Sequence, residues 1–440
     1  MKVLLVKCHK KTIFSMLEPI VTEPLELEYL SGSLTKMEIQ HKIYDPLIEG
    51  GSFVKVFNAY SPDVLVLTGY ITAVDTIISY SKYAKNRDAN IKVVVGGVHA
   101  EVNFEDFFVD TVDFIVHSDG INTFEKILQS HFAIEKAAAI NGIAFYNGDK
   151  WQVNSKSVTF LENMPMPNRN YFEQYKSRTK YMHYNPIAIV KTALSCPFQC
   201  NFCYCRLLNM GTYAARSIES VVEEIKGINA EYIWIVDDSF LIDRERVLHF
   251  IAEIKRERIE KKYIAYSRVD FIVNNEDIIN RLAEVGFIEL IIGMEAVEDQ
   301  RLEKLNKHCS SDDNMKAAEI LGKYDIGLTA LFIVGIDFTL QDFKSLRNSI
   351  EKMRLTCFTV SIFTPLKGTE VYQIYENQIK TKDYSKYDFL HLTIKPSQMH
   401  TTFFYLQFYL LYVRQFFISS YVRSFVYKSL KSMFNIWRKQ

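Results

Sequence analysis

Three cysteines stand close together near the middle of this 440-residue chain. Cys196, Cys200 and Cys203 follow the spacing C-x3-C-x2-C, and Cys205 lies just beyond. A structural zinc site usually takes four ligands as two separated pairs, and the sequence has no second C-x2-C or H-x3-H pair. Three thiolates suit an iron–sulfur cluster, in which one iron then stays open to an exogenous ligand. The alternative is a group of packing cysteines or a partial zinc knuckle. Cys205 is extra: it is either a small core residue or a further ligand or reactive thiol.

The cysteine segment begins a series of alternating strand and helix patterns. The strand candidates are residues 186–193, 232–237, 263–269, 288–294, 328–335 and 357–364. Ser217, Asp243 and Thr339 are expected helix N-caps, and Gly286 is an expected helix end. Six β/α units predict a partial parallel barrel, whose chemistry belongs on the loops at the carboxyl ends of its strands.

Polar and small residues stand at those strand ends. We expect these to form a binding site together, although each alone has a structural explanation, such as Asp238 capping the next helix. They are Asp237, Asp238, Arg268, Glu295, Gly335 and Pro365.

The N-terminal part of the chain has a similar alternation. Residues 2–6, 64–68, 91–95 and 112–116 are almost continuously apolar, as in strands that are buried on both faces of a parallel sheet. Helical spacing fills residues 24–37, 73–85 and 122–129. This pattern predicts a doubly wound α/β domain that binds a ligand at the strand ends. The turns of interest hold Thr68, Gly69, Gly96, Gly97 and Ser118. No G-x-G-x-x-G or P-loop is present, so nucleotide binding by those motifs is not supported.

These patterns divide the chain into four expected parts. An α/β domain spans residues 1–137, a linker with an Asn147-Gly148 hairpin spans 138–185, the barrel spans 186–382, and a basic, aromatic helical region spans 383–440. Residues 401–440 contain six basic and no acidic residues, and their apolar run is interrupted by polar side chains. Two explanations stay open for them: a helical cap over the barrel, or an interfacial amphipathic helix in peripheral contact with a membrane.

Composition limits the function classes. Lys+Arg and Asp+Glu are both 52, which argues against a general nucleic-acid binder. Seven cysteines, most of them in one segment, do not form a disulfide framework, and the N-terminus lacks the features of a signal peptide. A reducing cytoplasm is therefore the expected location.

The cysteine motif, with Phe202 before its last cysteine, resembles the radical S-adenosylmethionine (SAM) superfamily. The resemblance implies that Cys196, Cys200 and Cys203 hold a [4Fe–4S] cluster whose open iron binds the methionine part of SAM. It also implies SAM contacts from Phe202 and from the strand ends: the Asp237–Asp238 doublet with the amino group, Arg268 with the carboxylate, Glu295 with the ribose, and Gly335 and Pro365 beside the adenine.

The N-terminal region resembles the cobalamin-binding domain that precedes many radical SAM barrels. Three segments carry this resemblance: PDVLVLTGY, VVVGGVHAE and VDFIVHSDGINTFEKIL. Thr68, Gly69, Gly96, Gly97 and Ser118 would then face cobalamin. The chain departs from the pattern in two places, because the D-x-H-x-x-G loop is missing and His117-Ser118-Asp119-Gly120 replaces G-E-G-E.

Together the two resemblances imply an enzyme that cleaves SAM reductively to a 5′-deoxyadenosyl radical. The leading hypothesis is a cobalamin-dependent C-methyltransferase that acts on an unactivated carbon of a small-molecule or lipophilic substrate, with an external electron donor such as flavodoxin or ferredoxin. One alternative is a radical SAM cyclase or rearrangement enzyme without methyl transfer. Another is a non-catalytic iron–sulfur or cobalamin-binding sensor.

Overall fold

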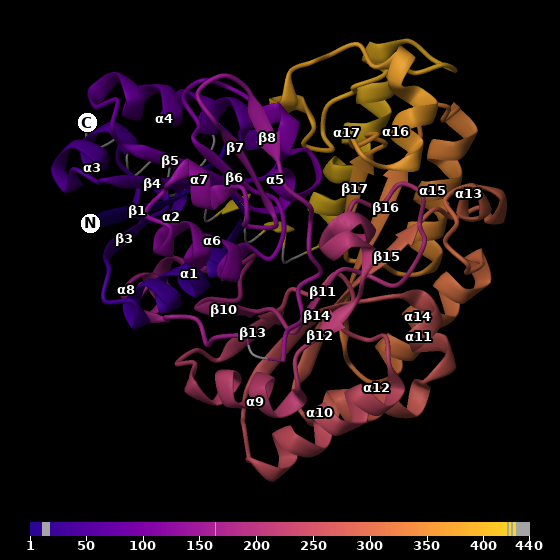
Figure 1. Cartoon of the computed structure of the whole chain (residues 1–440). Helices are drawn as coiled ribbons and strands as arrows, with labels where there is room; N and C mark the ends of the chain where they lie inside the picture. Colours follow the sequence, from indigo (N-terminus) through magenta and orange to yellow (C-terminus); the bar gives the residue numbers. More distant parts are fainter. Residues whose placement is uncertain (11–17, 163, 420–421, 424–425, 428–440) are drawn as a thin grey trace.

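The structure is a computed structural model that describes residues 1–10, 18–162, 164–419, 422–423 and 426–427. Two sheets organise it, one in the N-terminal domain and one in the barrel (Figure 1). The α/β class, the order of the domains and the C-terminal helix agree with the prediction from sequence.

The first sheet has seven strands in the order β3-β1-β4-β5-β6-β7-β8, and its first five strands are parallel. The strands are β1 (Lys2–Lys7), β3 (Gln40–Tyr44), β4 (Val64–Thr68), β5 (Lys92–Gly96), β6 (Phe114–Val116), β7 (Ile143–Tyr146) and β8 (Trp151–Val153). Val3 and Leu5 of β1 pack into one apolar cluster, whereas Leu4 and Val6 pack into the other. The sheet is therefore buried on both faces, which explains the continuous apolar runs.

Helices cover both faces of this sheet (Figure 1). They are α1 (Leu25–Lys36), α2 (Pro46–Glu49), α3 (Phe53–Tyr60), α4 (Val74–Arg87), α5 (Val98–Val102), α6 (Gly120–Gln129) and α7 (Ile134–Ala137). The expected hairpin is β7–β8, and β7 pairs antiparallel with β6, so the hairpin extends the first sheet. After it, α8 (Asn170–Tyr175) and a short ladder of β2 (Ile20–Val21) with β9 (Lys180–Tyr181) lead to the barrel.

The second sheet confirms the partial barrel: six parallel strands in the order β10-β13-β14-β15-β16-β17. The strands are β10 (Ile187–Val190), β13 (Tyr232–Ile235), β14 (Lys262–Ser267), β15 (Phe287–Glu295), β16 (Gly327–Val334) and β17 (Cys357–Ile362). Between β10 and β13, β11 (Ala193–Leu194) and β12 (Ala214–Ala215) flank the cysteine segment.

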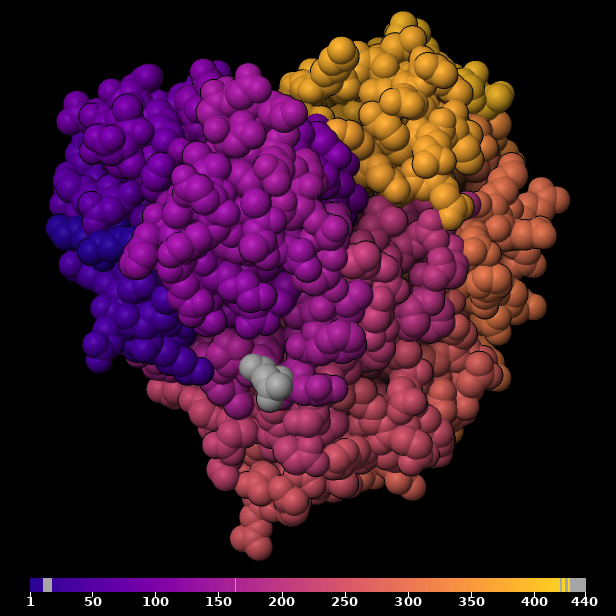
Figure 2. Space-filling view, in the orientation of Figure 1, coloured from indigo at the N-terminus to yellow at the C-terminus, as the bar shows by residue number. Residues whose placement is uncertain are grey.

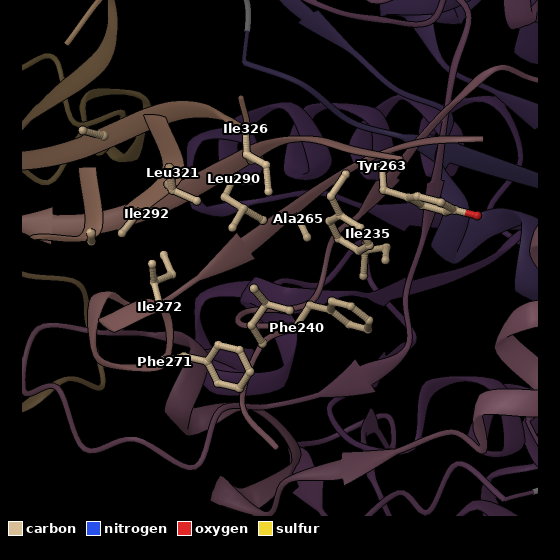
Figure 3. Packing of buried hydrophobic residues seen from close by; sticks show 14 of the residues in the cluster. Ile235, Phe240, Tyr263, Ala265, Phe271, Ile272, Leu290, Ile292, Leu321 and Ile326 are labelled. Carbon is tan, nitrogen blue, oxygen red and sulfur yellow. The ribbon is translucent and has the colours of Figure 1, made fainter. Parts of the chain in front are cut away.

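Helices pack on the outside of these strands. They are α9 (Ile218–Gly227), α10 (Arg244–Arg256), α11 (Val269–Asn274), α12 (Glu276–Glu284), α13 (Asp299–Lys304), α14 (Ser311–Lys323), α15 (Leu340–Lys352) and α16 (Glu370–Tyr375). Side chains such as Ile235, Ala265, Leu290 and Ile292 meet helix residues in one continuous core (Figure 3). Ser217, Asp243 and Thr339 do accept N-cap hydrogen bonds from α9, α10 and α15, as predicted.

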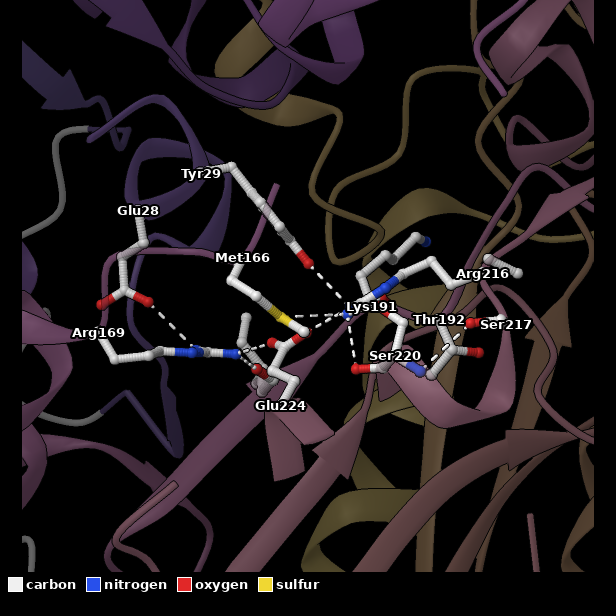
Figure 4. A network of polar contacts seen from close by, with 12 residues as sticks. Glu28, Tyr29, Met166, Arg169, Lys191, Thr192, Arg216, Ser217, Ser220 and Glu224 are labelled. Atoms are coloured by element: carbon white, nitrogen blue, oxygen red, sulfur yellow. Dashed lines mark hydrogen bonds and ion pairs between the residues drawn. The ribbon is translucent and has the colours of Figure 1, made fainter. Parts of the chain in front are cut away.

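A buried polar network ties the two domains together (Figure 4). The Arg169 guanidinium, in the linker, contacts Glu23 and Glu28 beside and within α1, and it also contacts Glu224 of α9. Arg216 pairs with the same Glu224 and donates to the hydroxyl of Tyr29. On the face shown in Figure 2, the first domain lies directly against the barrel and the C-terminal part of the chain.

The last described helix is α17 (Thr401–Ile418), which packs against α15. No described helix has the length and apolar character needed to span a bilayer. Residues 420–421, 424–425 and 428–440 of the predicted C-terminal region lie outside the described residues.

Candidate functional site

The cysteine motif lies in the loop after β11, at the end of the first barrel strand. Cys200 is buried, Cys196 and Cys203 are half-buried, and all seven cysteines of the chain are free. Burial and the neighbouring Cys203 and Cys200 thiols raise the pKa of Cys196 to about 11. Among the described residues no set of His, Cys, Asp or Glu converges tightly enough to hold a single metal ion. A [4Fe–4S] cluster does not require that convergence, because each thiolate binds a different iron.

Arg268, at the end of β14, lies on this loop. Its Nη1 is 3.7 Å from the Cys200 sulfur, and its guanidinium stacks 3.8 Å from the centre of the Phe198 ring. The remaining N–H groups are held by Asp270 and by the carbonyl of Lys307. The structure thus brings Arg268 to the predicted cluster ligand Cys200, and the contact with the SAM carboxylate stays a prediction.

The aspartate doublet after β13 divides between two environments. The Asp237 carboxylate accepts hydrogen bonds from the backbone N–H groups of Thr192 and Ala193, at 2.6 and 3.0 Å, so it fixes the chain just before the cysteine loop. Burial raises the pKa of Asp237. Asp238 Oδ2 and Ser239 Oγ, in contrast, are buried without a hydrogen-bond partner. Buried polar atoms are normally paired, so these two are free to receive a ligand. Ser239 was not predicted.

Glu295 ends β15 in a strained conformation. Its φ is +60°, in the left-handed region that costs a non-glycine residue about 1–3 kcal/mol, and the ladder to β16 is irregular there. The side chain is buried and pairs with Lys307 at 2.8 Å. A Cβ on Gly293 would lie 2.2 Å from the Glu295 carboxylate and 2.8 Å from the Lys307 ammonium, so glycine leaves room for the pair. Lys307 gave no signal in the sequence.

The other predicted SAM residues lie at the ends of neighbouring elements. Phe202 is half-buried in the cysteine loop, Gly335 directly follows β16, and Pro365 is buried after β17. A Cβ on Gly335 would approach Asp337 Oδ1 to 2.4 Å, so this turn has no space for a side chain. Within the part of the chain that the structure describes, no hydrogen bond or ion pair joins these three residues to one another.

The residues predicted to face cobalamin gather at one edge of the first sheet. Thr68 and Gly96 are partners in the β4–β5 ladder. Gly97 has φ +97°, and a Cβ there would lie 2.2 Å from Thr68 Oγ1. Ser118 Oγ accepts from the Ser157 N–H at 3.0 Å, and Gly69 precedes Tyr70, whose ring is 59% exposed. Doubly wound sheets bind ligands at this edge.

The two expected cofactor loops contact each other directly. The hydroxyl of Tyr204, next to Cys203, donates to the carbonyl of Val98, next to Gly97, at 3.1 Å. Asn103 donates to the carbonyl of Lys367 at 3.1 Å, which connects the same edge of the first sheet to the loop after β17. The structure therefore places the cysteine loop beside the carboxyl edge of the N-terminal sheet.

Charged and aromatic groups from both domains surround Cys205. Lys191 Nζ is 3.8 Å from Asp238 Oδ1, and the carboxylates of Asp238 and Asp237 raise the pKa of Lys191 in spite of its burial, with a smaller contribution from Tyr70. Burial, with a smaller contribution from Tyr70, raises the pKa of Tyr266. A hydrogen bond to Cys203 and desolvation by the surrounding protein raise the pKa of Cys205 well above its usual value. By surface exposure Cys205 is half-buried, like Cys196 and Cys203. Lys191, Tyr70 and Tyr266 were missed, because a single residue beside a strand carries no spacing signal.

The residues present fit the three groups that the sequence implies. Three free thiols suit cluster ligands. The unpaired Asp238 Oδ2 and Ser239 Oγ are acceptors of the kind that an ammonium group needs. The exposed Tyr70 ring beside small turn residues offers an open surface to a corrin.

Two family models match the chain: the B12 binding domain over residues 20–128 and the radical SAM superfamily over residues 190–350. The chain therefore contains a B12-binding domain and a radical SAM domain, and it is an enzyme. A [4Fe–4S] cluster, SAM and cobalamin are the cofactors of this combination.

Curated relatives extend over most of the chain. An uncharacterized methyltransferase of Pyrococcus horikoshii is 26% identical over 88% of this chain and 86% of its own length. The hopanoid C-3 methylase of Methylococcus capsulatus is 25% identical over 87% and 74%. An anaerobic magnesium-protoporphyrin IX monomethyl ester cyclase of Cereibacter sphaeroides is 24% identical over 86% and 64%.

Two solved structures share the fold. The cobalamin-dependent radical SAM enzyme OxsB, with aqua-cobalamin bound, superposes with a TM-score of 0.66 at 18% identity over 87% of this chain. This chain covers only 56% of OxsB. The radical SAM methyltransferase TsrM of Kitasatospora setae superposes with a TM-score of 0.69 at 14% identity, over 86% of this chain and 75% of TsrM.

Proposed function

We propose that the chain is a cobalamin-dependent radical SAM methyltransferase that acts on an unactivated carbon of a lipophilic small molecule. The observation that carries this proposal is the Tyr204–Val98 hydrogen bond, because it holds the cysteine loop against the B12-binding edge. Methyl transfer requires both cofactors to reach one substrate. The methylase and methyltransferase relatives support the same reaction class.

Each part of the site has a proposed role. Cys196, Cys200 and Cys203 hold the cluster, Asp238 and Ser239 receive the amino group of SAM, and Glu295, held by Lys307, faces the ribose. When bound, the cofactors supply reductive cleavage of SAM, hydrogen abstraction from an unactivated C–H bond and delivery of a methyl group. The protein supplies positioning and the exclusion of water around the buried Asp237.

The surroundings of the reaction belong to the proposal as well. An external donor such as flavodoxin or ferredoxin would reduce the cluster, in a reducing cytoplasm that keeps the cysteines free. The lipophilic substrate class rests on the hopanoid and tetrapyrrole names of the relatives. We also propose the division of the chain into residues 1–137, 138–185, 186–382 and 383–440 as its functional units.

A labelled-methyl experiment tests the reaction. Anaerobically reconstituted protein with cobalamin, reductant, SAM carrying a CD3 group and a hopanoid is expected to yield a product heavier by one labelled methyl group. A product without the label, formed from magnesium-protoporphyrin IX monomethyl ester, would support the cyclase alternative instead, which the cyclase relative favours. The protein could instead carry the cluster and cobalamin yet consume no SAM with either the hopanoid or the protoporphyrin ester. That result would contradict both the methyltransferase and the cyclase hypotheses and would favour a sensor.

A further inference from the structure

The helix α17 packs on the barrel through a face that includes polar side chains. Phe404, Phe408 and Leu411 are completely buried on this face. Gln407 accepts a hydrogen bond from Arg347 at 3.1 Å, and the Gln415 amide donates to the carbonyl of Phe358 at 2.8 Å. On the face of α17 that contacts the barrel, the apolar side chains are therefore buried and the two glutamines are hydrogen bonded.

The opposite face of α17 is apolar and exposed. Of its exposed positions, only Thr402 is polar. The other exposed side chains, here called the outer stripe, are Phe403, Leu406, Tyr409, Leu410, Val413, Phe417 and Ile418, with exposures from 38% to 69%. A surface helix in water normally carries charged and polar residues on its outer face. The outer face of α17 is instead apolar, like its buried face, which marks an interaction surface.

Two partners could cover the outer stripe: a second copy of the chain or a lipid surface. The charge of the C-terminal region favours the lipid surface. Residues 401–440 contain six basic residues and no acidic residue, although the whole chain is balanced at 52 of each sign. A second copy of the chain, docked by the same face about a two-fold axis, would bring two basic segments together, and like charges at an interface are unfavourable. An anionic lipid surface accommodates both features, because its headgroups attract the basic residues and its acyl boundary receives the stripe.

We propose that the outer stripe of α17 inserts into the interfacial region of an anionic membrane, to which the net positive charge of residues 401–440 attracts the chain. The described helices do not span a bilayer, so the contact is peripheral. This inference stands on the helix surface and the charge of the chain. It does not depend on whether the barrel transfers a methyl group.

Vesicle flotation of the full-length, cofactor-loaded protein tests the proposal. We expect the protein to float with phosphatidylcholine vesicles that contain about a quarter phosphatidylglycerol, and to float less at high salt, since surface charge is screened. The stripe variant Leu406→Gln, Leu410→Gln, Phe417→Gln is expected to lose at least about tenfold in partitioning, because apolar burial drives insertion. A second variant, Lys428→Gln, Lys431→Gln, Arg438→Gln, Lys439→Gln, is expected to lose its preference for anionic over neutral vesicles.

Matched substitutions control for a general change in surface hydrophobicity. Val54, Ile134 and Ile374 are 40%, 43% and 67% exposed and lie on other helices, so Val54→Gln, Ile134→Gln, Ile374→Gln should float like the unaltered protein. The stripe variant and this control change exposed side chains, and circular dichroism should show all variants equally folded. Equal flotation of the stripe variant and the unaltered protein would overturn the proposal. So would absence of flotation together with a dimer, seen by light scattering, that the stripe variant abolishes.

Discussion

Arg268 is held at the cysteine loop by several groups, and this changes what the residue is expected to do. Its guanidinium donates toward the Cys200 sulfur, stacks on Phe198 and contacts Asp270 and the Lys307 carbonyl. Adding an electron to a thiolate-bound cluster increases its negative charge. A nearby cation and an N–H donor to sulfur therefore favour the reduced state and raise the reduction potential.

Replacing Arg268 by Met is expected to lower the reduction potential of the cluster by about 60 mV, which is a tenfold change in the ratio of reduced to oxidised cluster. Arg268→Lys keeps the charge but loses the planar fork, so it should lower the potential less. An EPR-monitored redox titration measures the shift. Arg244→Met removes an exposed arginine paired with Asp277 and should leave the potential unchanged. An unaltered potential in an Arg268→Met protein with full iron content would contradict this role.

Some residues of the candidate site could be predicted from the sequence, and others could not. Cys196, Cys200 and Cys203 could be selected because their spacing is itself the signal. Lys307 could not, because its partner Glu295 lies across a loop and only the fold brings their charged atoms to 2.8 Å. The separate environments of Asp237 and Asp238 were equally invisible, since the two side chains are adjacent in the chain but face different neighbours.

At the scale of elements, apolar patterning located the buried strands and missed one edge strand. The five strands from β13 to β17 were each placed within two residues at their N-terminal ends. Strand β3 (Gln40–Tyr44) was not predicted, because it lies at the edge of the first sheet and its first residues are polar and partly exposed. Burial on both faces produces the apolar run that sequence reasoning recognises, and an edge strand lacks it.

The cysteine loop is the element whose ligand set can be tested most directly. Cys196→Ala, Cys200→Ala and Cys203→Ala are each expected to lose most of the bound iron after anaerobic reconstitution, because each removes one cluster ligand. Cys205→Ala is the matched control on the same loop and should retain iron, since Cys205 lies outside the C-x3-C-x2-C motif. Iron and sulfide assays measure the outcome. Loss of the cluster in Cys205→Ala with retention in Cys203→Ala would reassign the ligand.

At the scale of the whole molecule, the buried polar network between the two domains, here called the seam, contains more acidic than basic groups. Three carboxylates, Glu23, Glu28 and Glu224, share the two guanidiniums of Arg169 and Arg216. Full ionisation would leave one negative charge uncompensated in the interior, which is unfavourable. Glu23 Oε2 is buried without a hydrogen-bond partner, so no donor stabilises negative charge on that oxygen. Burial outweighs the attraction of Arg169 and raises the pKa of Glu23 to about 7 and that of Glu28 to about 8.

The sign of this shift predicts how stability depends on pH. Both pKa values are raised above the 4.5 of an unfolded glutamate, so the folded state binds the proton more tightly. The resulting stabilisation is complete below about pH 4.5 and is lost as the pH rises through about 7 to 8. Thermal unfolding is therefore expected to show a contribution from the seam that decreases between pH 6 and about 8.5. Glu28→Gln, which cannot ionise, should reduce that decrease.

Replacing Arg169 should lower the stability of the fold more than replacing any one of the three glutamates. Arg169→Met leaves buried carboxylates without a partner, and breaking a buried ion pair costs about 3–5 kcal/mol, so this variant should unfold at a lower temperature throughout the neutral range. Its loss should become smaller as acid protonates the carboxylates, whereas Glu257→Gln, at an exposed pair with Lys226, should change little at any pH. The unfolding temperature could instead decrease equally between pH 6 and about 8.5 in Glu28→Gln and in the unaltered protein. That result would mean that the titrating group is not Glu28. If the decrease is smaller in Glu28→Gln, the buried network that joins α1 and the linker to α9 is also a point at which rising pH lowers the stability of the fold.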